Sequence, residues 1–283
     1  QKPGIIFTCF GDMLRVPAGD KSLLQLKSSG SDIRIVLSPM DALQLAVENP
    51  EREVVFFAVG FETTAPLTAA TINLANQKQI TNFSILCAHK TMPAAIKALL
   101  PGSAVYALIC PGHVAVITGC KKFQFVAEIL KRPAAVAGFE PFDILLAIAY
   151  LIKDIKENAA HLYNCYPRAV DDNGNITAQE IIDQIFMPAD GIWRGLGLIQ
   201  DSCLSLRDEY SDFDAVKKFA PEPVSISDNP ACMCSAILRG ESSPEDCPLF
   251  DKQCTPEHPV GACMVSAEGS CAAAYKYMRR TAK

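Results

Sequence analysis

The sequence predicts an α/β protein with two parallel-sheet, Rossmann-like lobes and a mostly α C-terminal domain that gathers cysteines. Three observations lead to this fold class. Apolar runs alternate with helix-like segments as far as residue 156, and these runs are continuous, as in parallel strands covered on both faces. After residue 157 the chain becomes turn-rich and ends in closely spaced cysteines. We therefore expect the remainder of a first lobe at 1–50, a second lobe at 51–156 and a cysteine domain at 157–283.

The two lobes are expected to consist of repeated β-α units with right-handed crossovers. The expected strands are Ile5–Cys9, Ile33–Leu37, Val54–Val59, Phe83–Cys87, Val105–Cys110 and Ala134–Ala137. The expected helices lie near 20–29, 40–48, 64–77, 92–100, 122–131 and 141–156. Further on, we expect a helix at about 177–186, with Thr177 and Glu180 as a capping box, and a loop that runs into a helix between Gly261 and Tyr277.

A small polar group follows each expected strand, at the edge where open parallel sheets bind ligands. This placement predicts a functional cleft, and a purely structural alternative stays open, because threonines cap helices and glutamates near a helix start offset the helix dipole. Only four histidines are present, so a histidine-based metal site is not expected. The candidate residues of the cleft are Cys9, Glu62, Thr63, Thr64, His89, His113 and Glu140.

Four cysteines near the C-terminus have the spacing C-x-C-x12-C-x6-C. They are Cys232, Cys234, Cys247 and Cys254. Four thiolates within a short turn-rich segment suit a 4Fe-4S cluster or a tetrahedral zinc ion. A structural zinc site usually shows two C-x2-C pairs, and this segment has none, so the cluster ranks first, zinc second and disulfides last.

Composition narrows the classes of partner and compartment. The net charge is −5 and no basic tract occurs, so nucleic acid is not expected as a partner. The longest apolar runs are interrupted before they reach membrane-spanning length, so no membrane helix is expected. Twelve cysteines in a chain of 283 residues with an ample core indicate reduced thiols and metal in the cytoplasm rather than a secreted disulfide scaffold. No dinucleotide or P-loop glycine pattern is present.

Six short motifs occur in an order that matches one known family. They are Phe-Gly-Asp-Met-Leu-Arg-Val-Pro at 10–17, Gly-Phe-Glu-Thr-Thr-Ala-Pro at 60–66, Pro-Gly-His-Val at 111–114, Gly-Phe-Glu-Pro-Phe-Asp at 138–143, Trp-Arg-Gly-Leu-Gly at 193–197 and Ser-Ala-Glu-Gly-Ser-Cys at 266–271. With these motifs the chain resembles, over essentially its whole length, the HypD family of nickel-iron hydrogenase maturation proteins.

The resemblance implies a cytoplasmic scaffold on which iron receives its cyanide and carbon monoxide ligands together with HypC and HypE. It also implies a 4Fe-4S cluster in the C-terminal domain and a chain that is monomeric on its own. The alternative function is an iron-sulfur thiol-disulfide reductase or electron-transfer protein. We also expect Cys263 and Cys271 not to be cluster ligands, but one of them to lie close enough to exchange electrons. The alternative is that both are small buried hydrophobic residues.

The sequence departs from the family pattern in three places. Two family motifs, Cys-Gly-Gly-His-Thr-His and Gly-Pro-Gly-Cys-Pro-Val-Cys, have no counterpart, so the chain is expected to begin inside a domain and to leave the first lobe incomplete. The family commonly has Asn-Gln-Tyr at 164–166, where this chain has Asn-Cys-Tyr, and glycine at the position of Asp251. Neither of the last two changes is expected to threaten the fold.

Overall fold

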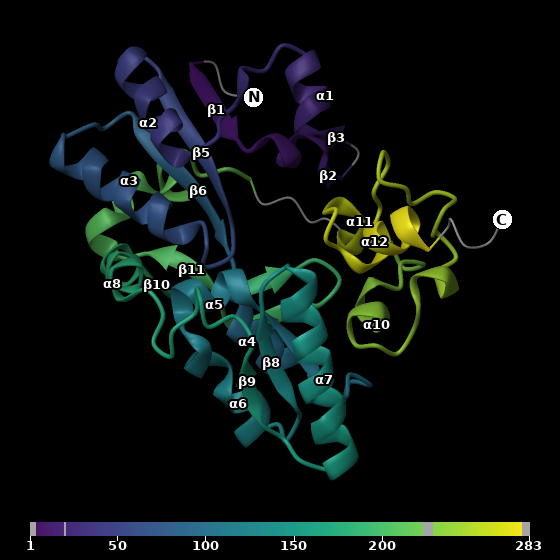
Figure 1. The fold of residues 1–283 in the computed structure, drawn as a ribbon. Coiled ribbons are helices and arrows are strands. Elements are labelled where there is room, and N and C mark those ends of the chain that lie inside the picture. The colour runs from purple at the N-terminus through teal and green to yellow at the C-terminus, as the bar shows by residue number, and fades with distance from the viewer. Residues whose placement is uncertain (1–3, 20, 223–228, 279–283) are drawn as a thin grey trace.

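The first lobe is built on a four-stranded parallel sheet with the order β4-β1-β5-β6. The computed structural model describes residues 4–19, 21–222 and 229–278. The strands are β1 (Ile5–Cys9), β4 (Ile33–Ile35), β5 (Glu53–Gly60) and β6 (Phe83–His89). Helices α2 (Pro39–Glu48) and α3 (Ala65–Gln77) pack beside this sheet (Figure 1). A small subdomain follows β1, with η1 (Gly11–Arg15), β2 (Pro17–Ala18), β3 (Lys21–Ser22) and α1 (Leu23–Ser28).

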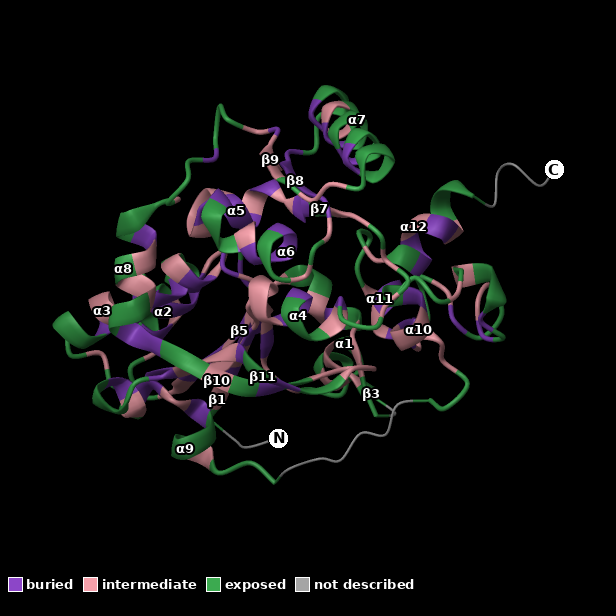
Figure 2. Cartoon of the chain, turned by 90° about the horizontal axis from the view of Figure 1, so that it is seen from below, coloured by how far each residue is buried: buried purple, intermediate pink, exposed green. Residues whose placement is uncertain are grey.

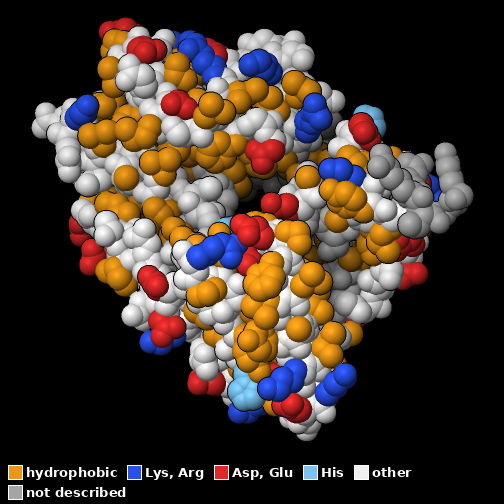
Figure 3. Space-filling view, viewed as in Figure 1, with side chains coloured by type: hydrophobic (Ala, Val, Ile, Leu, Met, Phe, Trp, Pro, Cys, Tyr) orange, Lys and Arg blue, Asp and Glu red, His pale blue; other side chains and the backbone are white. Residues whose placement is uncertain are grey.

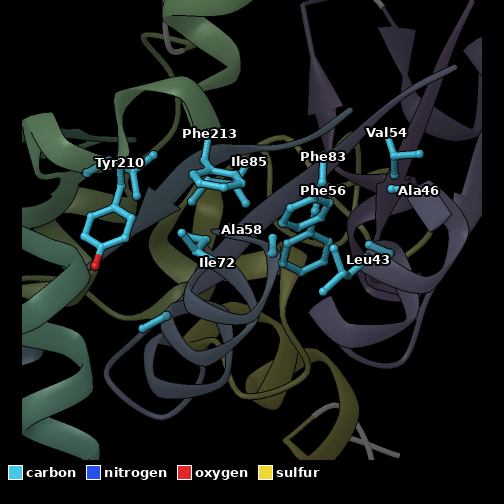
Figure 4. Packing of buried hydrophobic residues seen from close by; sticks show 14 of the residues in the cluster. Leu43, Ala46, Val54, Phe56, Ala58, Ile72, Phe83, Ile85, Tyr210 and Phe213 are labelled. Carbon is cyan, nitrogen blue, oxygen red and sulfur yellow. The ribbon is translucent and has the colours of Figure 1, made fainter. Parts of the chain in front are cut away.

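The core of this lobe joins residues that are far apart in the chain. Phe56 and Phe83 from adjacent strands are fully buried, and Tyr210 and Phe213 from the later segment pack into the same core (Figure 4). The side chain of Phe186 is also buried there. The first lobe is therefore completed by residues that follow the second lobe in sequence.

The second lobe contains a three-stranded parallel sheet with the order β7-β8-β9. The strands are β7 (Leu108–Pro111), β8 (Ala134–Ala137) and β9 (Leu162–Asn164). Its helical segments are α4 (Met92–Leu99), α5 (Gly112–Thr118), η2 (Cys120–Phe123), α6 (Gln124–Glu128) and α7 (Pro141–Glu157). Strand β8 is buried along its length, whereas α7 presents a largely exposed outer side (Figure 2).

A returning segment connects the lobes to the C-terminal domain. It consists of α8 (Ile176–Ile185), an antiparallel hairpin of β10 (Phe186–Trp193) and β11 (Gly197–Leu206), η3 (Asp208–Phe213) and α9 (Ala215–Phe219). The C-terminal domain has only short elements, namely α10 (Cys234–Leu238), η4 (Pro244–Asp246), α11 (Ala262–Val265) and α12 (Ser270–Tyr277). No helix among the described residues is long and apolar enough to cross a membrane.

The predicted fold class is confirmed, and the predicted boundaries need correction. Residue 50 was expected to separate the lobes, but it falls inside the first sheet, because β1 and β4 share that sheet with β5 and β6. The expected boundary at 157 also falls inside a lobe, since β9 pairs with β8 and the core of the first lobe includes Phe186 and Phe213. The sequence of a β-α unit does not show which sheet its strand joins, because parallel pairing depends on contacts between strands that are far apart in the chain.

Local differences from the predicted elements have simple causes. The segment near 122–131 forms a 3-10 turn and the short helix α6 in place of one helix. The helix near 20–29 begins only at Leu23, after the β2–β3 ribbon; residue 20 lies outside the described part. The expected capping box of Thr177 is wrong, because Asn175 caps α8 by accepting the Ala178 N–H at 3.0 Å.

Candidate functional site

The C-terminal domain gathers six cysteines in one small core, which we call the thiol pocket. These residues are Cys232, Cys234, Cys247, Cys254, Cys263 and Cys271. Five of them are buried and Cys232 is partly buried. Ile237, Leu249 and Met264 pack around the sulfur atoms. The pocket thus contains all four cysteines singled out by spacing, together with two that were expected to stand outside the ligand set.

Backbone N–H groups and neighbouring thiols form hydrogen bonds to sulfur atoms of the thiol pocket. Cys234 Sγ accepts the N–H of Cys263 at 3.4 Å, and Cys254 Sγ accepts the N–H of Val260 at 3.3 Å. The thiol of Cys234 also interacts with those of Cys263, Cys271 and Cys232. N–H groups directed at sulfur stabilise a thiolate and, where a metal is bound, tune it.

Gly261 makes room for two of the sulfur atoms. A Cβ at this position would lie 2.4 Å from Cys234 Sγ and 2.5 Å from Cys232 Sγ. The backbone φ of Gly261 is −98°, which any residue can adopt, so the need for glycine here is one of space alone. The sulfur atoms of Cys232 and Cys234 therefore both lie close to the backbone of Gly261, where no side chain intervenes.

The protonated pocket resists ionisation. The hydrogen bond to Cys234 raises the pKa of the Cys263 thiol to about 12, with burial acting in the same direction. For Cys271, the interaction with Cys234 lowers the pKa, but Cys263 and burial outweigh it and the pKa rises to about 12. Soft thiolate donors suit iron-sulfur clusters and zinc, and bound metal displaces the thiol protons. Within the described residues, no set of three or more Cys, His, Asp or Glu side chains is arranged to hold a single metal ion.

At the edge of the first lobe, the predicted cleft residues divide between core and surface. Cys9 and His89 are fully buried. The His89 ring lies 3.4 Å from Thr64 Oγ1 and 3.2 Å from Thr68 Oγ1, and burial lowers its pKa to about 4. Thr63 is exposed. His89 thus ties β6 to α3 as a neutral imidazole.

Glu62 lies in the turn between β5 and α3, and its side chain contacts the first residue of α4. The residue is 7% exposed, and Oε1 of its carboxylate accepts the N–H of Met92 at 3.0 Å. Burial raises the pKa of Glu62, while the N–H groups of Glu62 and Met92 and the charge of Lys122 oppose the shift. The contact with Met92 matches the structural alternative, in which a glutamate satisfies a helix N-terminus.

At the edge of the second lobe, Arg168 organises the loop that contains Glu140. Its guanidinium donates to both carboxylate oxygens of Asp143 at 2.7 Å and lies 3.0 Å from Glu140. It also lies 4.5 Å from the ring of Tyr166. His113 stacks on Phe139, with ring centroids 5.2 Å apart. The structure thus brings His113 and Glu140 to one edge, just after the adjacent strands β7 and β8, and leaves His89 inside the other lobe.

The turn of the β10–β11 hairpin reaches the thiol pocket. Arg194 donates to the carbonyl of Pro17 at 3.1 Å and to the carbonyl of Val260 at 2.9 Å. A Cβ on Gly195 would lie 3.7 Å from Cys234 Cβ. Behind the turn, Lys90 Nζ lies 3.0 Å from Cys203 Sγ and 2.9 Å from the carbonyl of Ile192. One turn therefore contacts both the first lobe and the metal-binding candidates.

Sequence reasoning missed several residues of these sites. Cys263 and Cys271 were expected outside the ligand set, with one of them close to it, and the structure places both in the thiol pocket. Arg168 and Arg194 stood out in no spacing pattern. The only sequence signal concerned Arg194, which lies within the Trp-Arg-Gly-Leu-Gly motif.

Fold and site together define a two-lobed α/β protein with a thiol-rich domain suited to a soft metal centre. A family model described as "HypD: Hydrogenase formation hypA family" matches residues 1–278. The hydrogenase maturation factor HypD of Escherichia coli K12 is 44% identical over 283 residues, covering 98% of this chain and 75% of that protein. HypD2 of Bradyrhizobium diazoefficiens is also 44% identical, over 99% of this chain and 76% of its own length. The chain belongs to the HypD family of hydrogenase maturation factors.

The backbone conformation of Asp251 bears on one departure noted in the sequence. Asp251 has φ 56°, in the left-handed region that glycine adopts most easily. A glycine at this position in the family therefore fits the backbone, and aspartate is among the residues that tolerate the same conformation.

Proposed function

We propose that this chain serves as a scaffold for assembling the Fe(CN)2CO group of nickel-iron hydrogenases, together with HypC-like and HypE-like partners in the cytoplasm. The thiol pocket is the observation that carries the proposal. Six cysteines converge in a domain with little other core, and Gly261 leaves space beside two of them. Such a donor set fits a 4Fe-4S cluster, which when bound supplies an electron for thiol or iron redox chemistry.

Cys232, Cys234, Cys247 and Cys254 are the ligands that the spacing predicts. The structure adds a competing choice for one corner, because Cys271 interacts with Cys234 and also feels the charge of Cys254. We therefore propose Cys232, Cys247 and Cys254 as three ligands and either Cys234 or Cys271 as the fourth. The two remaining thiols of the pocket lie beside the ligands, where they stay protonated or form a disulfide.

The loops at the strand ends are proposed to position the iron-bound ligands. Glu140 and His113 stand at the edge of the second lobe, and Thr63 is exposed at the edge of the first. Arg168 fixes the Glu140 loop by its contacts with Asp143. Cys9, Thr64 and His89 act through packing, since Thr64 Oγ1 donates to carbonyls of its own loop and the other two are fully buried.

A second function, thiol-disulfide reduction, is favoured by the number of thiols. Four sulfur atoms are enough for a cubane cluster, and this pocket has six. The two spare thiols touch the ligand set, which is the arrangement that a cluster-linked disulfide reductase requires. Disulfide reduction by the spare thiols would need no cyanide or carbon monoxide ligands.

Metal analysis tests the cluster. Anaerobically reconstituted protein is expected to contain about four iron and four sulfide per chain. Single replacement by serine of each pocket cysteine should abolish the cluster at the ligands and preserve it at the two spare positions. Cys120→Ser, which alters a buried thiol of the second lobe, is the matched control. Stoichiometric zinc, or retention of the full cluster in Cys247→Ser, would contradict the assignment.

Infrared spectroscopy separates the two functions. Protein purified with a HypC-like partner is expected to show cyanide and carbonyl stretches. Absence of these bands in cluster-loaded protein that reduces disulfides would establish the reductase function instead.

A further inference from the structure

Lys90, the residue that follows β6, lies against Cys203 of β11. Their backbones form an antiparallel bridge, and the neighbouring Thr91 donates its N–H to the carbonyl of Ser202 at 2.9 Å. Residues directly opposite each other in an antiparallel pair have adjacent side chains. The backbone therefore brings an amine and a thiol together from positions that are 113 residues apart in the chain.

The ammonium group of Lys90 is held directly against the sulfur atom of Cys203. Nζ donates to Sγ at 3.0 Å, a shorter contact than the two backbone N–H contacts to sulfur in the thiol pocket, at 3.3 and 3.4 Å. Nζ also donates to the carbonyl of Ile192 at 2.9 Å and lies 5.6 Å from the centre of the Trp193 ring. These further contacts keep the nitrogen beside the sulfur.

Gly191 on β10 leaves the space that the lysine and the cysteine occupy. A Cβ at this position would overlap Cys203 Sγ and would lie 3.2 Å from Lys90 Nζ. The pairing of β10 with β11 shifts register between Ala189 and Gly191. Irregularities of this kind change the direction in which side chains point. A glycine next to the register shift thus accommodates both the nitrogen and the sulfur.

Cys203 is more accessible than most thiols outside the thiol pocket. Buried thiols of the lobes are Cys9, Cys110, Cys120 and Cys165, whereas Cys203 and Cys87 are partly exposed. The Cys87 thiol donates to the carbonyl of Leu204 at 3.1 Å, and burial raises its pKa to about 11. A thiol held in its protonated form reacts slowly with oxidants, because the thiolate is the nucleophile. Among these six thiols, Cys203 is therefore the one that an oxidant should reach and modify first.

We propose that a peroxide converts Lys90 and Cys203 into a covalent sulfenamide crosslink between the end of β6 and β11. Peroxide first transfers one oxygen atom to the sulfur, which gives a sulfenic acid and water. The lysine amine, after it has released a proton to water, attacks this sulfur through Nζ. The S–N bond forms, the S–O bond breaks, and the departing hydroxide takes a proton from the nitrogen and leaves as water. The sulfur is oxidised by two electrons, one peroxide becomes two waters, and the neutral amine and thiol together lose two hydrogen atoms.

This crosslink joins the first lobe covalently to the hairpin that reaches the thiol pocket. The turn of the hairpin contains Arg194, which donates to the carbonyl of Val260 at 2.9 Å. Neither Lys90 nor Cys203 belongs to the thiol pocket. The oxidation therefore needs no metal and no partner protein, and it does not rest on the proposed function.

Peptide mapping of the 283-residue chain after treatment with hydrogen peroxide tests this site. Trypsin does not cut after a modified lysine, so the crosslink is expected to join residues 79–97 to residues 195–207, at a mass about 2 Da below the sum of the two peptides. A disulfide between Cys87 and Cys203 would join residues 79–90 to 195–207, because Lys90 stays cleavable. Detection of that disulfide alone, of Cys203 as a sulfinic acid without crosslink, or of unmodified Cys203 would overturn the proposal.

Variants assign the two atoms that react. K90R keeps a cationic donor beside the sulfur but has no amine nucleophile, so we expect no crosslink and a Cys203 sulfenic acid that dimedone labels. C203S should give neither product, and it reports on the site even if K90R does not fold. C87S removes the other partly exposed thiol and is the matched control, which should crosslink like the parent chain. Persistence of the crosslink in C203S, or its loss in folded C87S, would show that other atoms react.

Discussion

At Gly261 the lack of a side chain lets two sulfur atoms approach the same stretch of backbone. Distances of 2.4 and 2.5 Å from an added Cβ to Cys234 Sγ and Cys232 Sγ are too short for either sulfur to keep its place. Replacing a small core residue usually costs little stability, but here the displaced atoms are sulfur atoms proposed as metal ligands. A single methyl group therefore tests whether sulfur placement matters.

Gly261→Ala is expected to lower cluster content well below that of the parent chain. The methyl group must push apart Cys232 and Cys234, and overpacking of this kind typically costs 1–3 kcal/mol. Iron and sulfide analysis after anaerobic reconstitution measures the effect. Gly11→Ala is the control, since its added Cβ meets only Ile35 Cγ2, at 3.6 Å. Full iron content in Gly261→Ala would show that the C-x-C sulfurs are not both required.

His89 makes the stability of the first lobe depend on pH. Burial lowers its pKa to about 4, whereas an unfolded chain has a value near 6.5. Between these values the unfolded state binds a proton that the folded state excludes, so stability falls as pH decreases from about 6.5 to 4. The full loss from this one group is about 3 kcal/mol.

His89→Gln is expected to flatten this part of the pH profile. Glutamine can keep a contact with Thr68 but does not titrate, so the unfolding free energy should fall less steeply below pH 6.5 in the variant. Chemical denaturation between about pH 7 and 4.5 measures both profiles. Parallel profiles for the two proteins would mean that His89 is protonated in the folded state.

Among the elements, helix α7 depends on a contact made by a residue from beyond β9. Asp143 in the first turn of α7 is 1% exposed, and Arg168 holds both of its oxygens at 2.7 Å. Arg168 lowers the pKa of Asp143, so this contact stabilises the folded state above the unfolded pKa of an aspartate and is lost as pH falls below it. The loop 138–143, with Glu140 in it, is thereby fixed against the second sheet.

Arg168→Met is expected to destabilise the second lobe more than Asp143→Asn does. The first change leaves a buried carboxylate without its cation, whereas the second removes the charge and keeps a polar group of the same shape. Thermal unfolding of both single variants and the double variant measures the coupling. Additive effects in the double variant would show that the two side chains act independently.

Regular elements were predictable where one apolar run or one helical period sets the structure. β1, β5, β6 and β8 fall close to their predicted ranges because each is a continuous apolar run buried on both faces. The hairpin β10–β11 was missed, since Pro188 and several glycines interrupt it and its pairing is stabilised by contacts with other elements.

The thiol pocket was predictable in part for a similar reason. Spacing within one loop indicates cysteines that meet locally, and Cys232, Cys234, Cys247 and Cys254 do share one core. Cys263 and Cys271 join them only through the packing of α11 and α12.

In the whole molecule, Arg194 connects three regions that share no sheet. Its guanidinium bonds the carbonyl of Pro17 in the first lobe and that of Val260 beside the thiol pocket, and its backbone belongs to the hairpin turn. These two hydrogen bonds connect the hairpin turn to the first lobe and to the C-terminal domain.

Hydrophobic side chains remain exposed along α7, including Phe142 at 73% and Leu145 at 66% (Figure 3).

Arg194→Lys is expected to loosen the thiol domain while leaving both lobes folded. Lysine has one ammonium group and cannot span both carbonyls with the geometry of the planar guanidinium, so roughly 2 kcal/mol of charged hydrogen bonding is weakened. Hydrogen exchange should accelerate in residues 260–278 and at 17–19. Arg15→Lys, an exposed change in the first lobe, is the control. Unchanged exchange near Val260 would show that other contacts fix the domain.

The return of the chain to its first core has a consequence for biosynthesis. Ile85 and Asp214, which are 129 positions apart in the sequence, form a bridge, and Phe213 packs on strands made much earlier. On the ribosome, one face of the nascent sheet stays bare until the hairpin and η3 have emerged. Long-range closure of this kind slows folding and exposes apolar surface to aggregation. Nascent chains stalled before residue 186 should recruit chaperones, and those stalled well beyond residue 219 should release them.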